Sequence, residues 1–329
     1  MVVLFLTWVI SSCTTWGAAP AEEYFSLGMA YFELGKFEEA EKWLNRARAA
    51  DKTKTASEYN LGRIAFETGR YQDAAKLFEG ILKKDPENVM ALKAAAYTRI
   101  KTGDLEMAED LYRRVLVLVP ESADDGYNYA LVLFAMEKYA AVEETLSNHQ
   151  FALLDNNDVL LLFARAQSAQ GKIEAADSYA QWLANNSDPK VRYEYAQILE
   201  KAELYARALE EYRTALNGLS QDSTDPKKSD VRYTIARLLL IADAESDEGV
   251  TELKTAVSEG LTDMTLLEEL LKDERISAAN RDSIGTLIDE TKQAAAEAAA
   301  VAESGAAAKE EAESSETDVE GGSNSTDEG

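Results

Sequence analysis

TASEYNLGRIAFETGRYQDAAKLFEGILKKDPEN, residues 55–88, has the apolar spacing of two amphipathic helices on either side of Gly69. The first would carry Tyr59, Leu61, Ile64, Ala65 and Phe66, and the second Ala74, Ala75, Leu77, Phe78, Ile81 and Leu82. Gly69 can take the left-handed backbone conformation that ends a helix, and Pro86 ends the second one. Because such a hairpin leaves one face uncovered, this stretch predicts neighbours of its own kind.

The pattern recurs along the chain from Ala21 onward. Each expected first helix contains two consecutive residues of which the second is Gly or Ala. From one unit to the next, this small residue recurs after 34, 34, 34, 34, 32 and 40 residues: Leu27-Gly28, Leu61-Gly62, Ala95-Ala96, Tyr129-Ala130, Phe163-Ala164, Tyr195-Ala196 and Ile235-Ala236. Turn positions keep the same register, with Gly35, Gly69, Gly103 and Gly171, and with Glu137 and Glu203 in two further units. Small residues at Ala40, Ala74, Ala108, Ala176 and Ala208 mark the expected close contacts, and Leu44, Phe78, Tyr112 and Tyr212 supply the bulk four residues after them.

A 34-residue period with these features resembles the tetratricopeptide repeat (TPR) family. The resemblance is most specific in the first three units and covers about 240 of the 329 residues. It implies an all-α, right-handed α-solenoid of about seven hairpins over residues 21–262. The repeats are expected near residues 21–54, 55–88, 89–122, 123–156, 157–188, 189–222 and 229–262, with a polar loop before the last.

The segments outside the repeats have different compositions. Residues 264–272 and 280–292 have helical spacing without the repeat signature, so we assign residues 263–292 to capping helices. Residues 293–329 carry ten acidic residues, one lysine and no aromatic residue, which predicts a disordered acidic tail with at most one frayed helical stretch.

The N-terminus resembles a bacterial lipoprotein signal of the relaxed kind found in spirochaetes. An apolar run is followed by small residues and Cys13, and the run is too short to span a bilayer, for which about 20 residues are needed. The resemblance implies that residues 1–13 are a signal segment, that Cys13 becomes the lipidated first residue, and that residues 14–20 form a tether. The alternatives are a cleaved secretory signal and an apolar N-terminus in which Cys13 has no role.

Composition excludes several classes of function. Sixty acidic residues against 34 Lys and Arg give a net charge of -26, which disfavours nucleic acid as a partner. The single cysteine rules out an internal disulfide, and the single histidine, His149, is better explained as a loop or packing residue than as a ligand. Without nucleophile-base pairs, metal-ligand clusters or phosphate-binding glycine motifs, we expect no cofactor, no metal site and no enzyme activity.

The candidate binding surface is the concave one, which the first helices of the hairpins would line. Stepping along these helices gives the candidate partner-binding residues Phe25, Met29, Tyr59, Arg63, Phe66, Lys93, Tyr97, Tyr127, Arg165, Tyr193, Tyr233 and Arg237. Aromatic and Arg side chains dominate protein interfaces, although several of these rings, Phe25 and Phe66 among them, could instead fill the core. The carboxylate clamp of some TPR proteins is not carried over, because only Asn60 matches it.

We therefore expect a scaffold that binds a protein or peptide in its groove. Lipid on Cys13 would hold it to a bacterial envelope, facing the periplasm or the exterior, where the resemblance implies a role in assembling a membrane or cell-wall complex. One alternative is an accessory of solute uptake, with a small hydrophobic or carboxylate ligand enclosed by Phe25, Phe32, Phe66 and Tyr97. Another is a purely structural spacer. The groove residues and the occupant are hypotheses that depend on how the helices pack.

Overall fold

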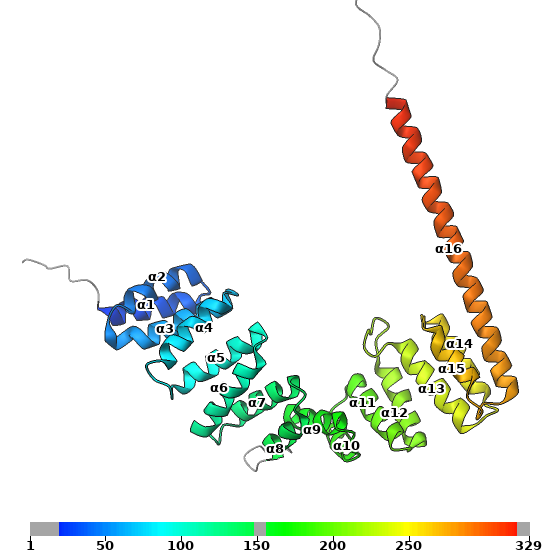
Figure 1. Ribbon diagram of the computed structural model, residues 1–329, viewed down its shortest axis with the longest axis horizontal. Helices are drawn as coiled ribbons and strands as arrows, with labels where there is room; N and C mark the ends of the chain where they lie inside the picture. The colour runs from blue at the N-terminus through cyan, green and yellow to red at the C-terminus, as the bar shows by residue number, and fades with distance from the viewer. Residues whose placement is uncertain (1–19, 148–155, 321–329) are drawn as a thin grey trace, which may run out of the picture. The chain divides into compact units, whose positions relative to one another are not determined.

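The computed structural model of the protein describes residues 20–147 and 156–320, and every regular element within these ranges is an α-helix (Figure 1). The predicted all-α class and the paired, TPR-like arrangement of helices are confirmed. The sixteen helices of the described ranges fall into two compact units, one ending at Gln170 and one beginning at Gly171.

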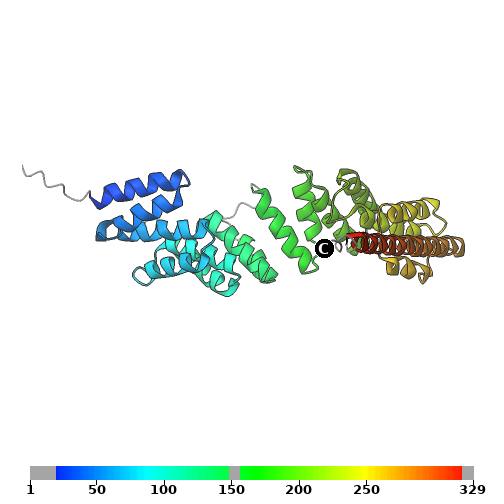
Figure 2. The same ribbon diagram turned by 90° about the horizontal axis from the view of Figure 1, so that it is seen from above.

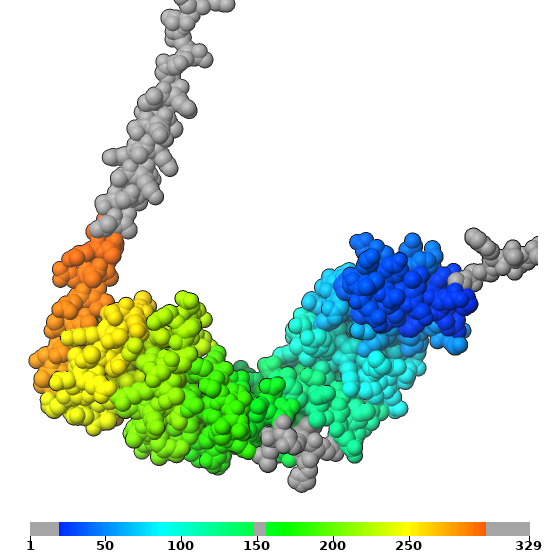
Figure 3. All heavy atoms as spheres, turned by 180° about the vertical axis from the view of Figure 1, so that it is seen from behind, coloured from blue at the N-terminus to red at the C-terminus, as the bar shows by residue number. Residues whose placement is uncertain are grey.

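The first unit stacks hairpin upon hairpin. Its helices are α1 (Ala21–Glu33), α2 (Phe37–Ala47), α3 (Asp51–Glu67), α4 (Tyr71–Leu82), α5 (Val89–Thr102), α6 (Leu105–Leu118), α7 (Ala123–Ala135), α8 (Tyr139–Ser147) and α9 (Asn157–Ala169). Each odd-numbered helix up to α7 packs on the next helix to form a hairpin, and each hairpin contacts its successor (Figures 1 and 2). In the space-filling view these hairpins lie directly against one another (Figure 3).

The second unit continues the same pattern. Its helices are α10 (Ala175–Leu183), α11 (Pro189–Lys201), α12 (Tyr205–Gly218), α13 (Lys228–Ala242), α14 (Asp247–Ser258), α15 (Met264–Leu271) and α16 (Ala278–Glu320). Helices α11 and α12 form one hairpin, and α13 and α14 form the next. In α10, the fully buried small residue is Ala175, the first residue of the helix, rather than the predicted Ala176.

Close contact between the two helices of a hairpin explains the small residues in the pattern. Gly62 of α3 lies against the ring of Phe78 in α4, and a Cβ atom built at Gly62 would lie 2.6 Å from Cε1 of that ring. Gly28 and Leu44 repeat the arrangement one hairpin earlier, with 2.7 Å between the built Cβ and Cγ of Leu44. The helices of these two hairpins can therefore approach closely because the residue on one helix is small and the residue facing it is large.

The turns inside the hairpins require a left-handed backbone. Gly69 has a φ of +75°, and the other turn glycines of the pattern are also positive. Glu137 and Glu203 occupy the equivalent turns and adopt φ values of 58° and 60°, which costs a non-glycine residue about 1–2 kcal/mol. The turn geometry of the repeat is thus kept even where the sequence signature has changed.

The last hairpin is covered by α15 and the first part of α16. Their apolar side chains join those of α13 and α14 in one core: Tyr233, Ala236, Leu240, Leu253, Ala256, Leu261, Leu267, Leu270, Ile276, Ile284, Leu287 and Ile288. Asn280 fixes the start of α16, because its side-chain amide donates to the carbonyl oxygen of Ala244 at 2.8 Å.

The structure differs from the prediction in the acidic tail. We expected a disordered tail from residue 293 onward with at most one frayed helical stretch, whereas α16 continues as a helix of 43 residues as far as Glu320. Its sequence beyond residue 292 is rich in Ala and Glu, which have high helix propensity, and the Gln293 amide donates to Glu297 one turn further on at 2.9 Å. Residues 293–300 are solvent-exposed, so local propensity rather than packing supports this stretch.

Within the described residues, no helix combines the length and the apolar character needed to cross a bilayer. The signal segment at residues 1–13, with Cys13, and the single histidine, His149, lie outside the described residues.

We predict that Gly62→Ala lowers the free energy of unfolding by about 1–2 kcal/mol, because overpacking against Phe78 outweighs the helix propensity gained, of about 1 kcal/mol. Gly80→Ala is the matched control. Gly80 lies in α4, where a built Cβ would meet nothing within 4 Å, so alanine there should stabilise by about 0.5–1 kcal/mol. Urea denaturation followed by circular dichroism measures both variants. Equal changes of the same sign would contradict the close-contact explanation.

Candidate binding groove

A pocket of about 350 Å³ lies among the first helices of three successive hairpins, α3, α5 and α7. It is lined by Tyr59, Arg63, Phe66, Glu67, Phe78, Lys93, Ala94, Tyr97, Thr98, Tyr112, Asp125 and Asn128. We call it the groove pocket. Five of the twelve candidate partner-binding residues meet in it, namely Tyr59, Arg63, Phe66, Lys93 and Tyr97.

Aromatic rings form much of the groove pocket. The rings of Phe66 and Tyr97 lie 5.1 Å apart between centroids, and Tyr59 lies 5.7 Å from Phe78, which is buried in the hairpin core. Tyr97 is 47% exposed, whereas Tyr59 and Phe66 are half-buried. The rings therefore serve the core and the pocket together, and Tyr97 presents the most accessible aromatic surface of the three.

Arg63 is the cation that the pocket leaves open to a ligand. Its guanidinium group stacks over the Phe32 ring at 4.4 Å, and Nη1 donates to Oδ1 of Asn60 at 3.1 Å. No carboxylate of the described residues lies within ion-pair distance of it. A half-buried guanidinium with no internal counter-ion is suited to bind a carboxylate, since its fixed donors match both oxygens.

Lys93 has an internal counter-ion, Asp125, which sequence reasoning missed. Lys93 Nζ lies 2.5 Å from Oδ2 of Asp125, whose side chain is only 4% exposed. The Ser122 hydroxyl also donates to Oδ2 at 2.5 Å, and the Asp125 backbone N–H donates to Ser122 Oγ at 3.4 Å. Ser122 caps α7 in this way, so the S-x-x-D spacing at residues 122–125 was the available signal. Lys93 thus neutralises a buried carboxylate in addition to lining the pocket.

Tyr112 forms part of the groove pocket beside this carboxylate. Burial raises the pKa of the Tyr112 hydroxyl to about 12, and the negative charges of Asp125 and of an ionised Tyr97 add to the effect. The hydroxyl therefore stays protonated through the neutral range.

The other candidates of the first unit lie outside this pocket. Phe25 and Met29 are partly buried against the core of the first hairpins, beside Leu44. Tyr127 packs against the core around α7 to α9, and burial raises the pKa of its hydroxyl, an effect that the positive charge of Arg165 opposes. Arg165 itself is half-buried in α9.

In the second unit, Tyr193 and Arg237 line a pocket of about 290 Å³ together with Gln197, Glu200, Lys201, Tyr212 and Thr234. The charges of its Arg237 and Glu200 are satisfied internally. Arg237 forms an ion pair with Glu200, and the Tyr212 hydroxyl donates to the same carboxylate at 2.9 Å. Burial, followed by the charge of Glu200, raises the pKa of the Tyr212 hydroxyl.

The expectation that Tyr233 faces an open groove is not met. Its side chain is 9% exposed and belongs to the core under the cap. Its hydroxyl donates to the carbonyl oxygen of Leu266 at 3.1 Å, because α15 covers the position that a ligand would otherwise occupy.

Within the same described ranges, no three His, Cys, Asp or Glu side chains are grouped so that they could hold a metal ion.

Comparison with known proteins identifies the family. A sequence model of the tetratricopeptide repeat matches residues 59–123 and 161–226, and a second model of the same repeat matches residues 21–54. With the paired helices and the 34-residue register, these matches show that the chain belongs to the tetratricopeptide repeat family. The fold of this family is typically non-catalytic and mediates binding of proteins and peptides.

Individual relatives are distant. An uncharacterized lipoprotein of Treponema pallidum (strain Nichols) is 26% identical over 142 residues, which are 43% of this chain and 72% of that protein. A tetratricopeptide repeat protein from Parabacteroides merdae ATCC 43184 is 19% identical, with a TM-score of 0.52 over 77% of this chain and 97% of the other. YrrB, described as a TPR protein with an unusual peptide-binding site, is 17% identical, with a TM-score of 0.49 over 60% of this chain and 98% of its own. The likeness to these solved structures concerns the fold alone.

We predict that Tyr112→Phe makes stability less dependent on pH in the alkaline range. An unfolded tyrosine releases its proton near pH ~10, whereas folded Tyr112 holds it to about pH 12. This contribution to stability is therefore fully present below pH ~10 and lost as the pH rises toward about 12. Urea midpoints at about pH 9 and about pH 11 should differ less in Tyr112→Phe than in the wild type. Tyr205→Phe is the control, because Tyr205 is 42% exposed, and it should keep the wild-type difference.

Proposed function

We propose that this protein is a scaffold that binds a peptide segment of a partner protein in the groove pocket. The observation that carries the proposal is that residues from three separate hairpins bring aromatic surface and a half-buried guanidinium without a counter-ion into one cavity. Aromatic and Arg side chains supply most of the affinity at interfaces, at roughly 2 kcal/mol or more for each dominant residue.

The pocket suggests how the peptide is held. One apolar side chain of the peptide would lie against Tyr97 and Tyr59, where aromatic surface is accessible. A carboxylate near it would pair with Arg63, which already has a ring beneath its plane and so keeps its orientation when the ligand is absent. The Lys93 ammonium, which is 41% exposed beside Asp125, would supply a further donor to the peptide backbone.

Enclosure of a small molecule receives less support. The four residues expected to surround such a ligand do not come together, since Phe66 and Tyr97 line the groove pocket while Phe25 and Phe32 do not. Phe32 is instead covered by the Arg63 guanidinium.

We further propose that lipid on Cys13 anchors the scaffold to a bacterial envelope, where it assists assembly of a membrane or cell-wall complex. Support comes from the small residues before Cys13 and from the lipoprotein of Treponema pallidum that is 26% identical over part of the chain. Residues 14–20 would span at most ~25 Å, so the anchor would hold the first hairpin near the membrane surface.

The groove proposal predicts a partner cross-link at position 97. A photoreactive phenylalanine in place of Tyr97 should form a discrete adduct in the native cell, whereas the same residue in place of Val117, which is 77% exposed on α6, should not. Arg63→Glu should abolish the adduct. Lys76→Glu, the same charge change at an exposed position of α4, should leave it intact. An adduct that survives Arg63→Glu would overturn the proposed binding mode.

The anchor proposal predicts that the mature chain begins at Cys13 and carries acyl chains. Intact-mass analysis of protein purified from the native membrane should give a mass above that of residues 13–329 by the mass of the lipid. Cys13→Ser should move the protein from the detergent phase to the aqueous phase on partitioning. An unmodified Cys13 in the mature protein would contradict this proposal and leave the groove proposal untouched.

A further inference from the structure

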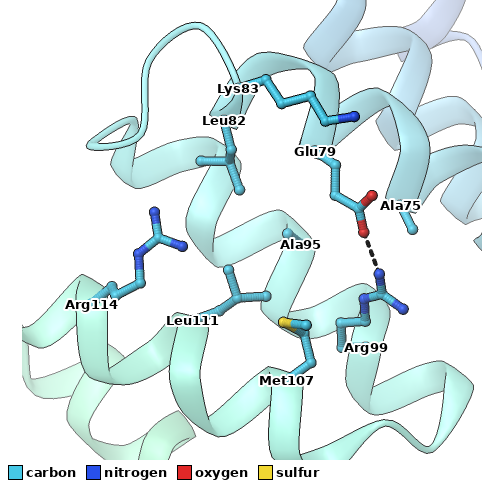
Figure 4. A pocket seen from close by; sticks show the side chains of 9 residues that line it. All are labelled: Ala75, Glu79, Leu82, Lys83, Ala95, Arg99, Met107, Leu111 and Arg114. Carbon is cyan, nitrogen blue, oxygen red and sulfur yellow. Dashed lines mark hydrogen bonds and ion pairs between the residues drawn. The ribbon is translucent and has the colours of Figure 1, made fainter.

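A second pocket, of about 320 Å³, lies among α4, α5 and α6 and shares no lining residue with the groove pocket (Figure 4). Its apolar part consists of Ala75, Leu82, Ala95, Met107 and Leu111. Lys83, Arg99 and Arg114 stand around these side chains (Figure 4). We call it the cationic pocket.

The repeat provides an internal comparison for the cationic pocket. The contact between the first and second hairpins contains the equivalent pocket, which is only about 140 Å³. Its Glu41, Arg48 and Asp73 each lie 34 residues before a residue of the cationic pocket, and the counterparts are Ala75, Leu82 and Met107. Three charged side chains have thus been replaced by apolar ones at one contact between hairpins.

The ion pair found at one register position of the neighbouring contacts is missing from this one, where Glu79 of α4 pairs instead with Arg99 of α5. Glu41 pairs with Arg70 between the first two hairpins, and Glu109 pairs with Lys138 at 2.7 Å between the third and fourth. The counterparts between the second and third hairpins are Ala75 and Asp104, which cannot form such a pair. The small Ala75 therefore opens the space that the larger side chain fills elsewhere.

The cations around the pocket are also specific to this contact. Counting back 34 residues from Lys83, Arg99 and Arg114 gives Ala49, Ala65 and Gly80. Arg99 forms ion pairs with Glu79 and Asp104, so its charge is satisfied internally.

Lys83 and Arg114 keep their charge available to a ligand. Arg114 Nη2 donates to the carbonyl oxygen of Pro86 at 2.7 Å, and in the described part of the chain neither residue has a carboxylate within ion-pair distance. Met107 is 44% exposed, so the apolar surface beside them is open to a partner. Two available cations beside an open apolar surface, on a protein of net charge -26, favour an acidic ligand with an apolar side chain.

We propose that the cationic pocket is a second binding site, which accepts an acidic peptide segment. One apolar side chain of the segment lies among Leu82, Met107 and Leu111, and carboxylates on either side of it pair with Lys83 and Arg114. This site is independent of the groove pocket, so the protein joins two partners, or two segments of one partner, through the same three hairpins.

The test uses the full chain labelled with ¹³C at the methionine methyl groups, and the probe peptide Ac-Gly-Asp-Leu-Glu-Gly-NH₂. The Met107 methyl resonance should shift in a saturable manner, while that of Met29, which packs in the first hairpins, should not. The neutral peptide Ac-Gly-Asn-Leu-Gln-Gly-NH₂ should bind at least about tenfold more weakly, and added salt should reduce the difference. Equal binding of the two peptides, or no shift of Met107, would overturn the proposal.

Two sets of variants test the assignment by fluorescence anisotropy of the labelled acidic peptide. Ala75→Glu combined with Met107→Asp places at the cationic pocket the two carboxylates that stand at the equivalent positions of the first hairpin contact, so it should repel the acidic peptide and lose binding while circular dichroism shows an unchanged helix content. Lys83→Ala combined with Arg114→Ala should also lose it. Arg63→Glu, in the groove pocket, should leave the shift of the Met107 methyl resonance by the acidic peptide unchanged, so failure here is distinguishable from failure of the groove proposal. Binding that survives Ala75→Glu with Met107→Asp would overturn the site, and self-association removed by the same pair would show that a second copy occupies it instead.

Discussion

The architecture depends on the close approach of two helices at a position where one of them lacks a side chain. Gly62 against Phe78 is the clearest case, since even a single Cβ would overlap the ring. Phe78 is fully buried because Gly62 leaves room for its ring. Gly28 leaves room for Leu44 in the same way. A hairpin built in this way has a fixed interhelical distance, and its successor must fit the same surface. The same residue types therefore recur every 34 residues, because each hairpin needs them for the same packing.

Such packing leaves two surfaces free to vary. The residues that hold a hairpin together point between its helices, so those on the outer side of either helix can change without loss of the fold. Around the second and third hairpins both surfaces have changed in a way that suits binding. Tyr59, Arg63 and Tyr97 lie on one, and Ala75 and Met107 on the other. Two different pockets thus arise within the same few helices, since each combines residues of the core with side chains on an outer face of the hairpins.

The sequence predicted the fold more completely than the site, and the reason is physical. Helix periodicity, small residues and turns are local properties, so the hairpins could be placed to within a few residues. The turn positions at Glu137 and Glu203 were identified from register alone, and the structure gives both a left-handed backbone. Whether a solvent-exposed segment forms a helix through its intrinsic helix propensity alone was harder to predict. After residue 292 at most one frayed helical stretch was expected in a disordered tail, whereas α16 extends as far as Glu320.

The site could be predicted only where it follows the repeat. Tyr59, Arg63 and Tyr97 were found because equivalent positions on successive first helices must share a face. Asp125 was missed because its role depends on a lysine 32 residues away, and Tyr233 was misplaced because a helix outside the repeats covers it. Contacts between elements of different kinds carry no periodic signal. They depend on three-dimensional packing, which leaves no recognisable pattern in a single sequence.

Charge decides which of the exposed surfaces can bind a partner. With 60 acidic residues, most of the protein surface repels acidic segments. A cation beside accessible aromatic or apolar surface is therefore a local exception in a repulsive field. Arg63 lies beside aromatic rings, and Lys83 and Arg114 lie beside an apolar surface. Repulsion from the rest of the surface would exclude acidic segments that cannot fill a pocket. The overall negative charge therefore increases the binding specificity of both pockets.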